Sequence, residues 1–253
     1  MVLARNQSFR GLVLRLQDYH DNDQLAYLLT DRYGLVTFLM RGIKKPNAKQ
    51  RYLVLPFTYG HYQGTFNDHG FSYLSTAQEL QQFENVAQDI FKNAYVTYIY
   101  DLTIRAFTSQ SLSTAWFEQI LWATKLIDAG QDPEIICNIL EVQLLQPFGV
   151  QPNWQRCVVG GENQGPFDYS IVYSGILCQK HWPQDKHRLH LKPKVVAYLR
   201  LFAQLRLRRI KHIAVDESTK AQLRHTLDII YQDTVSVYPK SKKFIDSMYR
   251  WQI

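Results

Sequence analysis

The pattern of apolar residues changes near Val86, from short strand-like runs to longer segments with helical spacing. Before this point, apolar runs are separated by turn signals such as Asp31–Gly34, in which the glycine permits a positive φ. After it, residues 86–107 contain no Gly or Pro and repeat apolar side chains every four residues from Ile90 to Leu102. The sequence therefore predicts an α+β fold in which a strand-rich part precedes a helical part.

The strand-rich part holds five apolar runs, the number of strands in a small closed barrel. The runs are Phe9–Leu16, Gln24–Thr30, Leu35–Met40, Tyr52–Tyr62 and Phe71–Ala77. We expect residues 1–80 to form an OB-fold domain. An SH3-like barrel has the same periodicity and stays open as an alternative.

Helices are expected over most of residues 81–253. Their predicted ranges are 86–107, 111–129, 132–145, 194–207, 218–235 and 241–251. Asp132 and Pro133 are typical of an N-cap and a first helical position. Residues 150–185 are rich in Gly and Pro, which predicts a loop-rich insert with one hairpin over Ser170–Leu177.

Charge is distributed unevenly along the chain, whose net charge is +7. Residues 1–80 carry nine Lys/Arg against six Asp/Glu, residues 81–179 four against ten, and residues 180–253 sixteen against six. The two basic ends favour an anionic partner, either a nucleic acid or a lipid surface.

The densest basic segment is the predicted loop Arg41–Arg51, which has five cations and no acid. The cations are Arg41, Lys44, Lys45, Lys49 and Arg51. A cationic loop on a barrel can follow a phosphate backbone, so we predict nucleic-acid binding here; the alternative is a loop that only keeps a hairpin solvated. Most aromatic residues between Tyr52 and Tyr73 are expected in the core, with one or two facing a ligand.

A second basic cluster spans Lys180–Lys211, with ten Lys/Arg and the single acid Asp185. Its densest part, Arg206, Arg208, Arg209 and Lys211, is predicted at a helix end. Cations there either complement the helix dipole or bind a further anionic partner.

Metal binding is considered for the insert, where Cys157-Val-Val-Gly160 and Cys178-Gln-Lys-His181 resemble two degenerate C-x-x-C pairs. Structural zinc takes four Cys or His ligands, and only Cys157, Cys178 and His181 remain. A site needs a fourth ligand such as His187. We therefore predict a degenerate site, no stoichiometric zinc and no other cofactor.

Catalysis finds no support in the sequence, which has no phosphate-binding loop, nucleophile elbow or H-E-x-x-H motif. The acidic residues around His20 are typical of a solvated turn. Three cysteines, no apolar leader after Met1 and no apolar run of about 18 residues predict a cytoplasmic protein without a disulfide framework.

The ordered set of segments in the first 57 residues resembles the amino-terminal domain of the RecO family. The segments are Gly11–Asp23 (GLVLRLQDYHDND), Leu28–Gly34 (LLTDRYG), Arg41–Lys45 (RGIKK) and Leu55–Phe57 (LPF). Cys157-x-x-Gly160 and Cys178-x-x-His181 stand where many relatives have C-x-x-C pairs, and Pro239–Phe244 is similar to the start of the family's last helix. The resemblance covers nearly the whole chain.

This resemblance implies an OB-fold domain, a helical domain and a non-catalytic recombination mediator acting at the nucleoid. Such proteins bind single- and double-stranded DNA, anneal complementary strands and, with RecR, load RecA onto DNA coated by single-stranded-DNA-binding protein. The family's DNA-contacting loop falls on Arg41, Lys44, Lys45, Lys49 and Arg51. The second cluster, Arg206, Arg208, Arg209 and Lys211, is a candidate for binding DNA or for docking the coat protein's acidic tail. An RNA-binding OB-fold protein and a protein-only scaffold are the competing hypotheses.

Overall fold

A computed structural model describes residues 2–67, 70–107 and 114–251. The chain divides into two compact units, the first ending at Gly130 and the second beginning at Gln131. The first unit therefore extends well beyond the barrel that was predicted for residues 1–80.

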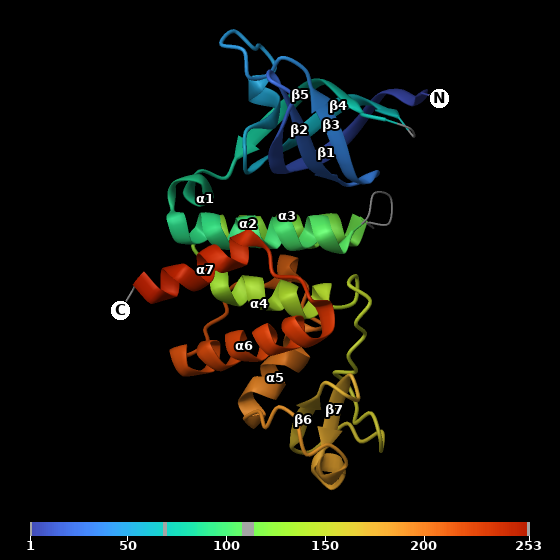
Figure 1. Cartoon of the computed structure of the whole chain (residues 1–253), viewed down its shortest axis with the longest axis vertical. Helices are drawn as coiled ribbons and strands as arrows, with labels where there is room; N and C mark the ends of the chain where they lie inside the picture. Colours follow the sequence, from blue (N-terminus) through green and yellow to red (C-terminus); the bar gives the residue numbers. More distant parts are fainter. Residues whose placement is uncertain (1, 68–69, 108–113, 252–253) are drawn as a thin grey trace. The chain divides into compact units, whose positions relative to one another are not determined.

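Five antiparallel strands build the barrel of the first unit (Figure 1): β1 Val2–Tyr19, β2 Asp23–Thr30, β3 Gly34–Met40, β4 Thr58–Asn67 and β5 Tyr73–Gln82. Their order is β3-β2-β1-β4-β5, and the long strand β1 pairs with both β2 and β4. The Leu39 N–H donates to the Ser72 carbonyl over 2.9 Å, which joins β3 to the start of β5 and closes the sheet. This topology is that of an OB-fold and confirms the expected fold class.

One predicted strand begins later than expected. Residues Arg51–Val54 form a 3-10 helix, and β4 starts only at Thr58. Pro56 has no N–H to donate to a ladder, and Phe57 has a φ of +57°, so the chain cannot stay extended through this stretch. The expected strand Tyr52–Tyr62 is correct in its second half and wrong in its first.

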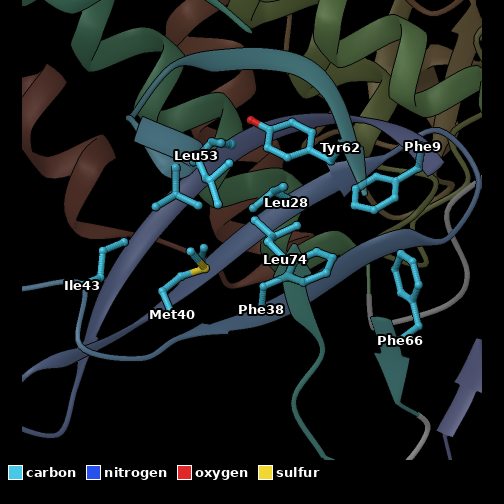
Figure 2. Packing of buried hydrophobic residues seen from close by; sticks show 12 residues of the cluster. Phe9, Leu28, Phe38, Met40, Ile43, Leu53, Tyr62, Phe66 and Leu74 are labelled. Carbon is cyan, nitrogen blue, oxygen red and sulfur yellow. The ribbon is translucent and has the colours of Figure 1, made fainter. Parts of the chain in front are cut away.

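Aromatic and aliphatic side chains fill the barrel (Figure 2). The ring of Phe9 stacks on Phe38 and Tyr62, with centroids 5.8 and 5.9 Å apart, and Phe66 meets it edge-on at 5.2 Å. These residues are all buried, together with Leu28, Met40 and Leu74. The barrel therefore has a packed interior, and any ligand must bind on its outside or at its ends.

The described residues of the first unit also form the helices α1 Glu84–Gln88, α2 Ile90–Ala106 and α3 Thr114–Asp128. The single helix predicted over 86–107 is broken at Asp89, whose extended backbone and carboxylate, accepting from the N–H groups of Phe91 and Lys92, cap α2. Residues 111–113 of the next predicted helix lie outside the described residues. Arg10 joins the barrel to α3 through Asp31 at 3.0 Å and Glu118 at 2.8 Å.

The second unit contains α4 Pro133–Leu144, α5 Pro193–Phe202, α6 Glu217–Ile230 and α7 Lys240–Trp251. Helix α4 is almost completely buried, and the carboxylate of Asp132 caps it ahead of Pro133, as predicted. Helix α6 passes into a π-helical turn, Tyr231–Val235, which ends at Ser236 with a φ of +56°. Among the described residues, no helix has the length and apolar character needed to cross a membrane.

The insert of the second unit is ordered around the hairpin of β6 Phe167–Ser170 and β7 Gly175–Cys178, followed by a 3-10 helix, Gln179–Gln184. The hairpin confirms the one expected near Ser170–Leu177. In Figure 1 it lies beside α5, with which β6 is in contact. The loop-rich insert within a helical region, expected at residues 150–185, is therefore present.

Candidate functional site

The basic loop Arg41–Arg51 is fixed at its base by apolar side chains. Ile43 and Leu53 are 3% and 0% exposed and join the barrel core in Figure 2. The Gly42 N–H donates to the Asp23 carboxylate over 2.7 Å, and the Lys44 N–H donates to the Asn22 carbonyl over 3.1 Å. Gly42 has a φ of +63°, which favours glycine at the start of this turn. The loop therefore has a defined conformation at its base, and its charges point away from the core.

All five predicted cations of this loop are exposed, but their surroundings differ. Arg51 donates to the main-chain oxygens of Lys45, at 2.9 Å, and Ile43, at 3.3 Å, and so holds the loop together. Lys44 forms an ion pair with Asp18 at 3.0 Å. Lys45 and Lys49 have no ion-pair partner in the described part of the chain. Unlike Arg41, Lys44 and Arg51, these two side chains also have no hydrogen-bond partner among the described residues, so they are the most available to a ligand.

Arg41 is associated with an aromatic group at the neighbouring edge of the barrel. Its guanidinium lies 5.5 Å from the centroid of the Tyr73 ring and donates to the Tyr73 hydroxyl over 3.3 Å. Tyr19 contacts the rings of His20 and Phe71, with centroids 4.1 and 5.2 Å apart. Partly exposed rings beside a cation can stack on bases. Of the seven aromatic residues from Tyr52 to Tyr73, only Tyr62 and Phe66 are buried in the core, so the expectation that most of them lie there is wrong.

The second basic cluster does not lie at a helix end, so that part of the prediction is wrong. Helix α5 ends at Phe202, and Arg206 precedes a separate 3-10 helix, Leu207–Arg209. The cation in the last turn of α5 is Arg200, which donates to the Trp154 and Gln155 carbonyls. The helix dipole therefore does not account for the cluster, and all four of its cations are exposed.

A surface hollow of about 260 Å³ adjoins this cluster. Its walls are formed by Leu201, Gln204, Leu205, Arg206 and Arg209. Leu201 is 49% exposed, a high fraction for a large apolar side chain. Arg208 and Lys211 are exposed but do not line the hollow. The structure thus brings together two of the four predicted cations and an apolar wall.

Four potential metal ligands meet in the insert: Cys157, Glu162, Cys178 and His181. Their ligand atoms all lie within 4.8 Å of one another. His181 Nδ1 is 3.4 Å from Cys157 Sγ, 3.2 Å from Cys178 Sγ and 3.8 Å from Glu162 Oε2. His187, the fourth ligand considered from the sequence, is not part of this group.

Sequence reasoning missed Glu162 because it matches no C-x-x-C spacing. The turn that carries it is closed by the Cys157 N–H, which donates to the Glu162 carbonyl over 2.7 Å, and by the Gly161 N–H, which donates to the Cys157 carbonyl over 2.9 Å. Glu162 is the only acid between Cys157 and Asp168, and that was the available signal. The donor set of two sulfurs, one nitrogen and one carboxylate suits zinc.

The two cysteines of this group differ in acidity. Burial opposes ionisation of Cys157, but hydrogen bonds from the backbone N–H groups of Gly160, Cys178 and Val159 lower the pKa of its thiol to about 7. Burial and the neighbouring Cys157 raise the pKa of Cys178. Burial also raises the pKa of Cys137, which lies inside α4 and is not part of this cluster.

Comparison with known proteins covers nearly the whole chain. The family models described as "Recombination protein O N terminal" and "Recombination protein O C terminal" match residues 4–83 and 87–243. The proteins named "DNA repair protein RecO" from Limosilactobacillus fermentum and Ligilactobacillus salivarius are each 44% identical to the chain; the matches cover 97% and 98% of this chain and 90% and 96% of theirs. The protein of the same name from Enterococcus faecalis is 42% identical over 96% of this chain and 93% of its own.

These matches agree with the OB-fold and the helical region described above. The chain belongs to the RecO family of DNA repair proteins.

Proposed function

We propose that this protein is a non-catalytic recombination mediator that binds single- and double-stranded DNA and anneals complementary strands. With RecR, it helps to load RecA onto DNA coated by single-stranded-DNA-binding protein, and it acts in the cytoplasm at the nucleoid. Membership in a family of DNA repair proteins supports the repair role. The finer steps rest on the basic loop and on the hollow beside α5.

The observation that carries DNA binding is the rigidly anchored loop whose Lys45 and Lys49 charges are not neutralised. Phosphate attraction is long-ranged and needs no fixed side-chain geometry, so flexible lysines on a fixed base suit a backbone contact. Arg41 with Tyr73 adds a surface on which an unpaired base can stack. Together these features favour a strand whose bases are accessible.

Annealing follows from the same charges without covalent chemistry. Two complementary strands repel each other through their phosphates, and protein cations lower this repulsion while the bases stay free to pair. A catalytic group is not needed for this reaction. The role of the loop is to hold one strand, with its bases outward, where a second strand can reach it.

The test compares the double variant Lys44→Ala, Lys45→Ala with Arg206→Ala, Arg209→Ala in DNA titrations and strand annealing. We expect the loop variant to lose DNA affinity and annealing, and its plot of log affinity against log salt to flatten by about 0.7 per lost phosphate contact on single strands. An unchanged affinity and slope in a folded loop variant would refute the loop's role. Matched RNA oligomers distinguish an RNA binder, and no binding at low salt would indicate a scaffold.

The hollow beside α5 supports the coat protein as a second partner. An acidic peptide with an apolar end fits a site in which Leu201 and Leu205 supply an apolar wall and Arg206 and Arg209 supply the charge. The tail of single-stranded-DNA-binding protein has this chemistry. Binding of such a peptide, and its loss in Arg206→Ala, Arg209→Ala, tests the assignment separately from DNA binding.

A further inference from the structure

We propose that the Glu162 carboxylate is the fourth ligand of a structural zinc site that it forms with Cys157, Cys178 and His181. Three ligands are too few for a closed structural site, and this is why the sequence predicts no zinc. The turn after Cys157 supplies the missing ligand, Glu162, which lies outside the segments Cys157–Gly160 and Cys178–His181. The inference is independent of the proposed function, since it concerns only the insert of the second unit.

The first support is the spacing of the ligand atoms. With zinc–sulfur bonds of about 2.3 Å and zinc–nitrogen or zinc–oxygen bonds of about 2.0–2.2 Å, tetrahedral coordination places neighbouring ligand atoms roughly 3.3–3.8 Å apart. The observed distances from His181 Nδ1 to the two sulfurs, 3.4 and 3.2 Å, and to Glu162 Oε2, 3.8 Å, are close to this range. The side chains are therefore arranged around one point without a change of fold.

The second support is the space at residue 160. A Cβ atom added to Gly160 would overlap Glu162 Oε2 and the Cε1 atom of His181. The Glu162 carboxylate thus occupies the place that a ligating side chain on residue 160 would need. A ligand on Glu162 therefore takes the same corner of the site that a ligand on residue 160 would fill.

The third support is an unsatisfied polar atom. Glu162 Oε2 is excluded from solvent and has no hydrogen-bond partner in the described part of the chain. An unpaired carboxylate oxygen out of contact with water is costly, whereas coordination to a cation satisfies it. Since this oxygen lies 3.8 Å from His181 Nδ1, the unsatisfied group points into the ligand cluster.

A zinc ion at this point would link three segments of the insert and so add to the hydrogen bonds between them. Cys157 and Glu162 lie on one turn, Cys178 ends β7, and His181 lies in the 3-10 helix Gln179–Gln184. With four protein ligands the site is closed, so its role is structural. We expect metal binding to stabilise the insert.

The first experiment measures metal in the full-length protein purified under reducing conditions. We expect about one zinc per chain by elemental analysis. After chelation, titration with cobalt(II) should produce the visible bands of tetrahedral cobalt and a thiolate-to-cobalt charge-transfer band with the intensity of two thiolates. Absence of zinc together with absence of these cobalt bands would overturn the proposal.

The second experiment tests the carboxylate. Glu162→Ala should weaken cobalt and zinc binding by more than the roughly 10–100-fold loss typical of a group outside the coordination shell. Adding Gly160→Cys to Glu162→Ala should restore affinity and increase the charge-transfer band to three thiolates. Cys137→Ala is the matched control and should keep the metal.

Equal metal affinity in the wild-type protein and Glu162→Ala would show that Glu162 is not a ligand and would refute the proposal. If Glu162→Ala does not fold, Glu162→Gln, which keeps the shape of the side chain and removes its charge, replaces it and should also bind cobalt more weakly.

Discussion

The guanidinium of Arg51 donates a hydrogen bond to the main-chain oxygen of Lys45, 2.9 Å away, within the same basic loop. Arg51 also donates to the Ile43 carbonyl, so this cation supports the loop that presents Lys45. Cations that are equivalent in the sequence are therefore of two kinds, one that shapes the loop and one that is available to a phosphate.

This difference predicts unequal effects on stability. Arg51→Ala should lower the free energy of unfolding by about 1 kcal/mol, because hydrogen bonds to two carbonyls are lost. Lys49→Ala, which removes an exposed charge, should change it by less than about 0.5 kcal/mol. Urea denaturation of both variants checks the prediction, and equal effects would show that Arg51 does not shape the loop.

The ion pair of Lys44 with Asp18 predicts a variant that binds DNA more tightly. Both side chains are exposed, and such pairs contribute roughly 0.2–1 kcal/mol, so releasing Lys44 by Asp18→Asn should strengthen DNA binding by up to about fivefold at low salt. Asp21→Asn removes the same charge from the adjacent turn without touching the pair. Titrations at two salt concentrations check the difference, which should shrink at high salt. The same gain in both variants would mean that net charge alone is responsible.

The hollow beside α5 predicts that its apolar and its charged residues affect the salt dependence of peptide binding differently. Leu201→Ala should weaken binding of an acidic peptide with an apolar end by about five- to tenfold, with little change in salt dependence. Arg206→Ala, Arg209→Ala should flatten the salt dependence. Val172→Ala, at an 80% exposed apolar residue in the insert, is the matched control. Calorimetric titration measures all three, and binding unaffected by Leu201→Ala would exclude the hollow as the site.

Lys242 predicts a loss of stability at high pH. Its side chain is 7% exposed and lies 2.8 Å from Asp228 and 2.7 Å from Asp246. Burial disfavours its charged form, but Glu141, Asp228 and Asp246 outweigh burial and raise the pKa of Lys242. A raised pKa means that the folded state holds the proton more tightly than the unfolded state. The stabilisation is therefore complete below the ordinary lysine pKa of about 10.4 and is lost as the pH rises above it.

The measurement for Lys242 is urea denaturation between neutral and alkaline pH. Lys242→Met should lower the free energy of unfolding by about 2–3 kcal/mol at neutral pH. This is less than the loss expected for a fully buried pair, because the carboxylates of Asp228 and Asp246 are partly exposed. The difference from wild type should narrow above about pH 10.4. Lys240→Met, at an exposed position of the same helix, is the control. A difference that does not depend on pH would show that lost packing, and not the ion pair, is responsible.

Sequence patterns predicted those parts of the fold that depend on local chemistry. The β2–β3 hairpin follows from a turn that ends at Gly34, whose φ is +67°, and the start of α4 follows from Asp132 and Pro133. The break at Asp89 could not be predicted, because apolar spacing continues through it and only the cap geometry shows that two helices meet there.

The candidate sites were predicted as sets of residues but not as arrangements. All five loop cations lie at the surface, as their position in a loop predicts, yet their different surroundings depend on the anchoring of Ile43 and on Asp18 from another strand. Glu162 could not be found by spacing, since its place in the ligand group is set by a turn and by the space above Gly160.

Ile43 and Leu53 are buried in the same core, so the segment between them is anchored to the barrel at both ends. Its two ends are held by apolar packing, whereas its outward side chains contribute little to that packing. Substitutions can therefore change the charges of this segment while the barrel core stays intact, both in evolution and in engineered variants. Transplanting the segment between relatives, with both anchors retained, should transfer nucleic-acid preference from one barrel to another.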